Sequence, residues 1–160
     1  MEMEFDVKIT KKDLYEYQLY HAYTTPSALI GTTIGCLFII GFIHTGTALM
    51  LIAGIFAIAY IPWMLNIRAA SQAASEAFKN PIHYKADENG LEVSIGEEKQ
   101  LVPWDVFTKA TTSRKSVLLY TSKVNAYIFP RRVLGEDVNT FVQIISRYMP
   151  AKKVKIRGSI

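Results

Sequence analysis

Residues Pro26 to Leu65 read PSALIGTTIGCLFIIGFIHTGTALMLIAGIFAIAYIPWML, and this stretch decides the fold of the chain. It lies within 51 residues, Tyr17 to Ile67, that contain no Asp, Glu, Lys or Arg. As one helix, its 40 residues would be about 60 Å long, roughly twice the hydrocarbon thickness of a bilayer. Splitting it at the HTG sequence leaves residues 26–43 and 47–65, about 27 and 28 Å of helix. The sequence therefore predicts two transmembrane spans joined by a short, uncharged turn.

The charges flanking this stretch predict its orientation in a cell membrane. Of the net charge of +4, about −2 precedes the apolar stretch and +6 follows it, whereas the HTG turn carries no Lys or Arg. Loops rich in Lys and Arg stay on the cytoplasmic side, so we expect a multi-pass protein with two spans and both termini cytoplasmic. Aromatic rings prefer the headgroup level, and four of them flank the spans as membrane-interface anchors: Tyr20, Tyr23, Tyr60 and Trp63.

Small residues predict how the two spans pack. Gly31 and Gly35 form a small-xxx-small face on the first span, and Ala53 and Ala57 form a second one on the other span. Such residues let helix backbones approach closely where lipid supplies no hydrophobic drive. Packing within the chain and homodimerisation both remain open. The single cysteine, Cys36, lies within the first span and is expected to pack there.

The remainder of the chain alternates between helical and strand periodicity. Residues 66–80 are expected to continue the second span as a helix that ends before Pro81. About six short strands then follow, with Pro103 expected at an edge or bulge, before a helix from Val138 to Met149. The segment EFDVKIT, Glu4 to Thr10, alternates as a strand that could pair with the later sheet.

These elements predict an α+β membrane protein, in which a two-helix transmembrane hairpin carries a small antiparallel β domain capped by a C-terminal helix. We divide the chain into an N-terminal strand and short helix that pack with the β domain (1–25), the hairpin (26–65), a helical extension (66–80), the β domain with its helix (81–150) and a basic tail (151–160). Lys152 to Arg157 of the tail could lie against anionic lipid or be mobile.

The order of elements, together with VPW (Val102 to Trp104), LLY (Leu118 to Tyr120) and YIFPRR (Tyr127 to Arg132), resembles the YcxB-like family of bacterial membrane proteins. The resemblance covers nearly the whole chain, although each motif is short. The β-rich part in turn resembles bacterial pleckstrin-homology-like (PH-like) domains, which implies a bent antiparallel sheet capped by a C-terminal helix. The resemblance implies a fold and a membrane location, but no established reaction.

Catalytic chemistry is not evident in the sequence. No nucleotide-binding loop, clustered Cys and His, or nucleophile with a base is present, and His21, His44 and His83 are dispersed. We expect no enzyme, no catalytic residue, no cofactor, no metal and no nucleic-acid partner. The candidate interaction surface is Trp104 with Pro130, Arg131 and Arg132, where two guanidinium groups in a loop could hold a phosphate or a carboxylate. In the alternative interpretation, Trp104 fills the core and the arginines are solvated.

Two function classes stay open. The first is a membrane-anchored, non-catalytic interaction or regulatory module that binds membrane lipid, a protein partner or a second copy of itself. Protection against a membrane-active peptide is one variant of this class, suggested by PH-like membrane proteins that act in bacteriocin immunity. The second class is an accessory subunit of a transporter or pore complex that assembles through the glycine face.

Overall fold

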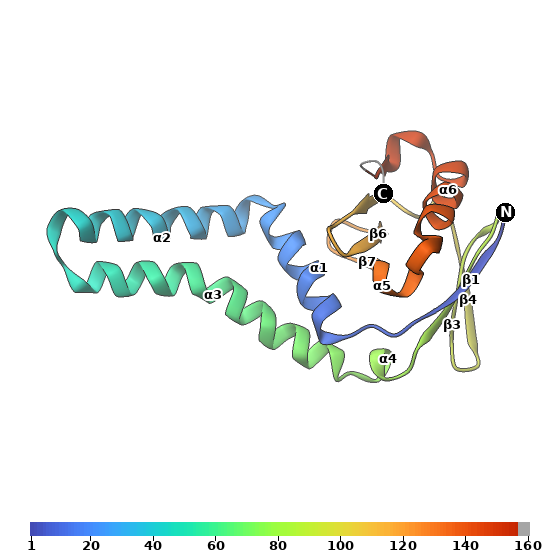
Figure 1. The fold of residues 1–160 in the computed structure, drawn as a ribbon, viewed down its shortest axis with the longest axis horizontal. Coiled ribbons are helices and arrows are strands. Elements are labelled where there is room, and N and C mark those ends of the chain that lie inside the picture. The colour runs from blue at the N-terminus through green and yellow to red at the C-terminus, as the bar shows by residue number, and fades with distance from the viewer. Residues whose placement is uncertain (157–160) are drawn as a thin grey trace.

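The computed structural model describes residues 1–156 and has two parts, an apolar helical hairpin and a mixed α+β domain (Figure 1). The α+β fold class is confirmed. Arg157 and the last three residues of the predicted basic tail lie outside the described residues. The hairpin projects from the domain along the long axis of the molecule, and the N-terminus lies on the domain.

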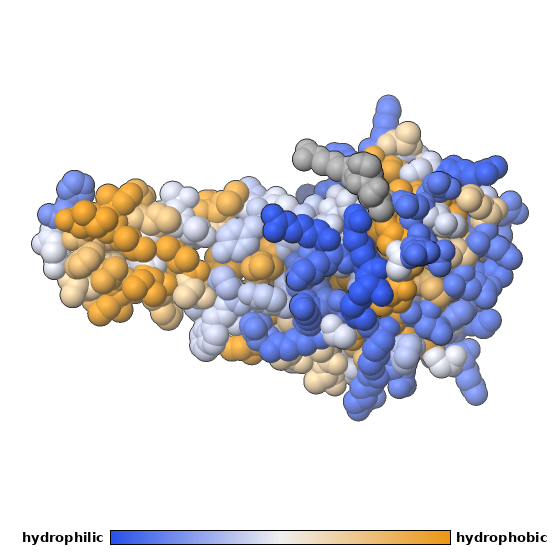
Figure 2. All heavy atoms as spheres, in the orientation of Figure 1, coloured by the Kyte–Doolittle hydropathy of each residue, from blue (hydrophilic) through white to orange (hydrophobic). Residues whose placement is uncertain are grey.

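The hairpin consists of α2 (Pro26–Thr45) and α3 (Ala48–Ala73), joined through Gly46 and Thr47. Gly46 ends α2 with a left-handed φ of 68°, a backbone conformation that glycine adopts at little cost. Both helices are long and apolar enough to cross a membrane, and only 11% of each apolar window is buried within the chain. Apolar residues therefore cover the hairpin surface, whereas polar residues cover the domain (Figure 2).

The second long helix continues well beyond the apolar window predicted as a span. It contains Pro62, and its second half runs at an angle to its first half (Figure 1). The helix ends at Ala73, and a separate short helix, α4 (Glu76–Lys79), follows. The prediction of one continuous helix over 66–80 was therefore wrong, because the chain must turn at residues 74–75 to enter the sheet.

The domain contains two four-stranded sheets. The first has the order β1-β2-β3-β4 and is antiparallel throughout. The second has the order β7-β6-β5-β8, in which only the β5–β8 pair is parallel. The strands are β1 (Met3–Val7), β2 (Ile82–Ala86), β3 (Gly90–Ile95), β4 (Glu98–Pro103), β5 (Lys109–Thr112), β6 (Ser116–Tyr120), β7 (Ala126–Pro130) and β8 (Val154–Lys155).

The N-terminal strand, which precedes the hairpin in the chain, pairs with a strand that follows the hairpin. β1 pairs with β2 over five residues, from Met3 opposite Ala86 to Val7 opposite Ile82, which confirms the predicted pairing. The following helix, α1 (Lys11–Tyr23), leads from β1 to the hairpin and packs against α3 (Figure 1). The chain thus leaves the domain through α1, forms the hairpin and returns through α3.

The core of the domain combines aliphatic and aromatic side chains and joins both sheets to the C-terminal helix α6 (Val138–Tyr148). Phe141 of α6 lies edge-to-face with Phe129 and Phe5, at ring separations of 4.8 and 5.2 Å. Offset and edge-to-face pairs of this kind add about 0.5–1.5 kcal/mol each beyond area burial. Beyond α6, a 3-10 turn (Ala151–Lys153) and β8 pack part of the predicted basic tail onto β5.

Candidate functional site

A cleft of about 270 Å³ lies between α1 and the short helix α5 (Arg131–Leu134). Its walls come from the first turns of α1, the β5–β6 connection and the junction of β7 with α5. Five lining residues are basic and two are acidic; with one proline they are Lys12, Arg114, Lys115, Arg131, Arg132, Asp13, Glu16 and Pro130. We call this site the basic cleft. In Figure 2, strongly hydrophilic residues gather on the face between the hairpin and the domain.

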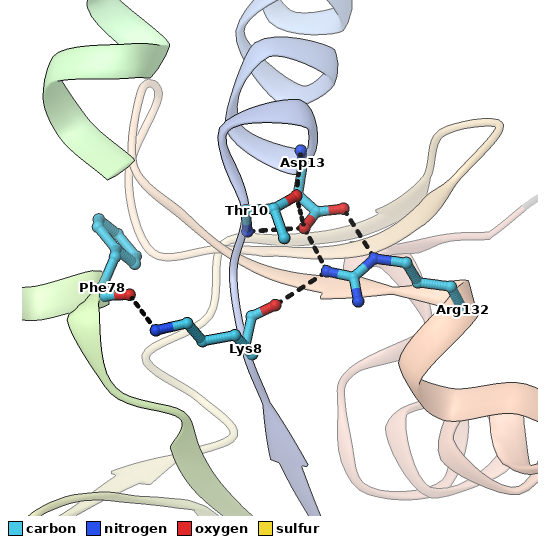
Figure 3. A network of polar contacts seen from close by, with 5 residues as sticks. All are labelled: Lys8, Thr10, Asp13, Phe78 and Arg132. Atoms are coloured by element: carbon cyan, nitrogen blue, oxygen red, sulfur yellow. Dashed lines mark hydrogen bonds and ion pairs between the residues drawn. The ribbon is translucent and has the colours of Figure 1, made fainter. Parts of the chain in front are cut away.

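At the cleft, the guanidinium group of Arg132 already donates hydrogen bonds to other residues of the protein (Figure 3). Its Nη2 donates to Asp13 Oδ2 at 2.5 Å and to the Lys8 carbonyl oxygen at 2.9 Å, and its Nε donates to Asp13 Oδ1 at 3.4 Å. Lys8 Nζ in turn donates to the carbonyl oxygens of Phe78 and Lys79, the last two residues of α4. This network ties α5 to the start of α1 and to the segment where the chain returns from the hairpin.

Asp13 also begins α1. Its Oδ2 accepts hydrogen bonds from Thr10 N at 2.8 Å and Thr10 Oγ1 at 2.7 Å, and its backbone N donates to Thr10 Oγ1, which together form a capping box. The residue is 8% exposed. Burial opposes ionisation of Asp13, but the hydrogen bonds from Arg132 and Thr10 outweigh it and lower the pKa of the carboxyl group below its ordinary value.

Arg131, unlike Arg132, has no side-chain hydrogen bond or ion pair with another described residue. Its backbone N donates to the Lys115 carbonyl oxygen at 2.8 Å, but its side-chain Nε is buried without a hydrogen-bond partner. Among the described residues, no carboxylate lies within 4.0 Å of the charged groups of Lys12, Arg114, Lys115 or Arg131. A guanidinium group with an unused donor beside further cations suits a carboxylate or a phosphate.

The predicted interaction residues do not lie together. Pro130 and the two arginines line the cleft, but Trp104 is 5% exposed in the core, where its Nε1 donates to the Asp87 carbonyl oxygen at 2.8 Å. The expected loop after Pro130 is instead the first turn of α5. Sequence analysis missed Lys12, Asp13, Arg114 and Lys115, although Thr10-x-x-Asp13 is a recognisable capping pattern.

The predicted helix-packing residues lie mainly between α2 and α3. A Cβ atom on Gly35 would come within 2.6 Å of Ile58 Cγ1 and 3.0 Å of the Gly54 carbonyl oxygen, and 3.3 Å from Ala57 Cβ. Gly31 faces Ile61 of α3. Ala53 is half-buried, whereas the neighbouring Gly54, which the sequence analysis did not select, makes the close approach to Gly35. The glycine face is thus used within this chain.

The predicted interface anchors differ in exposure. Trp63 is 62% exposed and Tyr60 is also exposed, both on the outer surface of α3. Tyr20 and Tyr23 are half-buried, and Tyr20 packs against the domain core. Within residues 1–156, no three His, Cys, Asp or Glu side chains are grouped as a metal site.

Comparison with known families identifies the part of the domain that contains most of the basic cleft. Residues 86–145 match the family model described as YcxB-like protein. This segment is therefore similar to YcxB-like proteins. The match runs from the end of β2 into α6 and includes Arg114, Lys115, Arg131 and Arg132, whereas α1 and the hairpin lie outside the matched range. Searches of curated proteins and of solved structures found no match. The PH-like relationship stays a prediction.

Proposed function

We propose that this protein is a membrane-anchored, non-catalytic interaction or regulatory module. The α2–α3 hairpin inserts into the cell membrane, and the YcxB-like domain lies on the cytoplasmic side with both termini. The basic cleft binds an anionic group of a protein partner. The observation that carries this proposal is a cleft in which four of the five basic side chains have no carboxylate within 4.0 Å among the described residues.

Membrane insertion is supported by the exposure of large apolar side chains along the hairpin. Ile43 and Leu49 are each more than two-thirds exposed. No other large apolar residue among residues 1–156 is exposed to this extent. Transferring such surface into hydrocarbon is favourable by about 25 cal/mol per Å² of apolar area. A continuous apolar surface along two whole helices would be unusual for a monomeric soluble protein in water.

The proposal of a protein partner is supported by the ion pair that connects the cleft to the helix leading into the hairpin. The Asp13–Arg132 pair joins one wall of the cleft to α1, which continues to the hairpin. A partner that binds the cleft would therefore act on a surface whose position relative to the membrane is held by α1. The glycine face, on which the accessory-subunit alternative relied, packs within the chain, so no observation favours that alternative.

Thiol labelling in intact cells tests the orientation. In a Cys36→Ala background, we expect Thr45→Cys at the end of α2 to react with an impermeant reagent from outside, and Glu97→Cys in the β3–β4 turn to react only after permeabilisation. The reverse pattern would contradict the orientation. Reaction of neither residue, even after permeabilisation and denaturation, would indicate a failed reagent, so a denatured sample is included as the positive control.

Copurification tests the interaction. The full chain, purified in mild detergent, is expected to retain a stoichiometric protein partner whose binding is lost in Lys115→Gln with Arg131→Gln. Arg147→Gln, on α6 and outside the cleft lining, removes one charge and serves as the control. A partner retained equally by all variants would contradict a role for the basic cleft.

A further inference from the structure

A second, larger cavity of about 530 Å³ lies where α1, the end of α3 and α4 meet the two sheets. It shares no lining residue with the basic cleft. Its volume falls within the range of about 300–1,000 Å³ that is usual for ligand pockets.

The interior of the cavity is apolar. Its walls include Ile9, Leu14, Ile82, Val93 and Ile128, all of which belong to the core of the domain. Protein interiors are normally packed without voids much larger than a water molecule. These buried residues form the floor of the cavity. Its accessible lining is also mostly apolar and includes Phe78, Ile95 and Val124, so it suits a hydrocarbon chain.

Polar groups lie on the helical side of the same cavity. Gln18 Nε2 of α1 donates to Gln72 Oε1 of α3 at 2.9 Å, while Gln18 Oε1 is buried without a partner. Rotating both amides by 180° would satisfy Gln18 Oε1 but leave Gln18 Nε2 unpaired, so one polar group of Gln18 remains unused either way. The lining also includes Arg68, for which no carboxylate lies within 4.0 Å among residues 1–156.

The polar side of the cavity lies just beyond the apolar part of α3. Arg68 follows Trp63 by five residues, about 7.5 Å along a helix. The headgroup region of a bilayer extends about 5–8 Å beyond the hydrocarbon on each side. If Trp63 lies at the edge of the hydrocarbon, Arg68 is at the level of the headgroups or just beyond them on the side of the domain.

We propose that this cavity binds a single-chain anionic amphiphile, with its acyl chain between the apolar walls and its carboxylate or phosphate at Arg68. The inference rests on the proposed membrane insertion of the hairpin, which puts the cavity within reach of membrane-derived amphiphiles. A fatty acid and a monoacyl phospholipid share this chemistry. The unused polar group of Gln18 provides a further hydrogen-bonding position on the polar side of the cavity.

Photolabelling of the full chain in nanodiscs of neutral phospholipid tests the proposal. The probe is palmitic acid with a diazirine near the end of its chain, and labelled peptides are mapped by mass spectrometry. Labelling of β2 and β7 should saturate and be competed by unlabelled palmitate. Competition by a monoacyl phosphate, compared with palmitate, shows which headgroup binds better. An amine of the same chain length should not compete.

Variants separate the cavity from the membrane surface. Arg68→Gln should weaken labelling of the cavity about fivefold, as expected for a partly exposed ion pair of about 1 kcal/mol. Arg114→Gln removes the same charge at the basic cleft and should have no effect. Competitors shortened from twelve to eleven and ten carbons should lose about fourfold in affinity per methylene. Val93→Trp, which fills the cavity, should abolish labelling of β2 and β7.

Three results would overturn the proposal. The first is labelled hairpin peptides with unlabelled β2 and β7, which would show membrane insertion without cavity binding and so leave the proposed function intact. The second is equal competition by the amine and the acid, together with full labelling in Arg68→Gln. The third is undiminished cavity labelling in a folded Val93→Trp variant. Because Arg68 is exposed, its variant is expected to fold and keeps the proposal testable if Val93→Trp does not.

Discussion

The Asp13–Arg132 pair should stabilise the folded state through a measurable coupling between α1 and α5. The Asp13 side chain is 10% exposed and the Arg132 side chain 50% exposed, with two hydrogen bonds between them. Hydrogen bonds to charged groups contribute about 1.5–3 kcal/mol. Because Arg132 is half exposed, solvent screening reduces this value, and we expect Arg132→Gln to lower the free energy of unfolding by about 1–2 kcal/mol.

A double-mutant cycle isolates the pairwise contribution. Asp13→Asn keeps a side-chain oxygen for the capping box but removes the charge, so its cost should also be about 1–2 kcal/mol. In the double variant, the second substitution removes an interaction that is already lost, and the coupling energy should be about 1 kcal/mol. The measurement is equilibrium unfolding of the full chain in one detergent, with each variant compared at the same detergent concentration.

The exposed Glu76–Lys79 pair is the matched control. It also joins an acid to a base, but its side chains are 85% and 57% exposed. Exposed pairs at this spacing on a helix are worth about 0.2–0.5 kcal/mol. A coupling between Asp13 and Arg132 that is no larger than the coupling between Glu76 and Lys79 would refute the argument that burial and the second hydrogen bond make this pair a structural connection.

Three further predictions concern the hairpin, the pH dependence and the core. Gly35→Ala should destabilise the hairpin by about 1–3 kcal/mol, because the added Cβ would lie 3.0 Å from the Gly54 carbonyl oxygen. In the control Gly41→Ala, the added Cβ meets only the flexible Met50 side chain, so this variant should be neutral or stabilising. Equal unfolding midpoints for the two variants would contradict the close helix crossing. The pKa of Asp13 is lowered in the folded state, so its contribution to the free energy of unfolding should be complete above the ordinary aspartate pKa of about 4 and lost as the pH falls through the folded pKa. The acid-induced loss of stability should therefore be smaller in Arg132→Gln. Identical pH profiles of stability for the two proteins would contradict the assignment. Trp104→Phe should cost about 0.5–1.5 kcal/mol by removing the hydrogen bond to the part-buried Asp87 carbonyl oxygen, without changing partner binding at the basic cleft. Weakened partner binding by a stably folded variant would place Trp104 in the interaction surface after all.

The sequence by itself determined the two apolar helices, the class of the domain and most of its elements. These features depend on properties that are local along the chain. A charge-free stretch of twice the bilayer thickness must fold back on itself, and periods of 2 and 3.6 residues distinguish strands from helices wherever one face is buried. The pairing of the N-terminal strand with the later sheet was predictable because its alternation required a partner.

Only the tertiary structure decided which polar groups meet. Asp13 and Arg132 are separated by 119 residues, and the capping pattern at Thr10 gives no indication that the same carboxylate also binds an arginine. The two neighbouring arginines looked equivalent in the sequence, yet one is held by Asp13 and the other has an unused donor. Hydropathy and periodicity contain no information on such long-range pairs.

The same limit applies to close approaches and cavities. Spacing alone suggested Ala53 and Ala57 for the second helix. Ala57 does face Gly35, but the crossing geometry of α2 and α3 makes Gly54 the residue of closest backbone approach. The sequence left open whether Trp104 lies in the core or on a binding surface, and the structure places it in the core with its Nε1 bonded to the Asp87 carbonyl oxygen. The larger cavity exists because α1, α3 and α4 meet the two sheets without filling the space between them. Whether a side chain fills a core, a contact or a cavity wall depends on elements distant in the chain, and only their packing in three dimensions decides it.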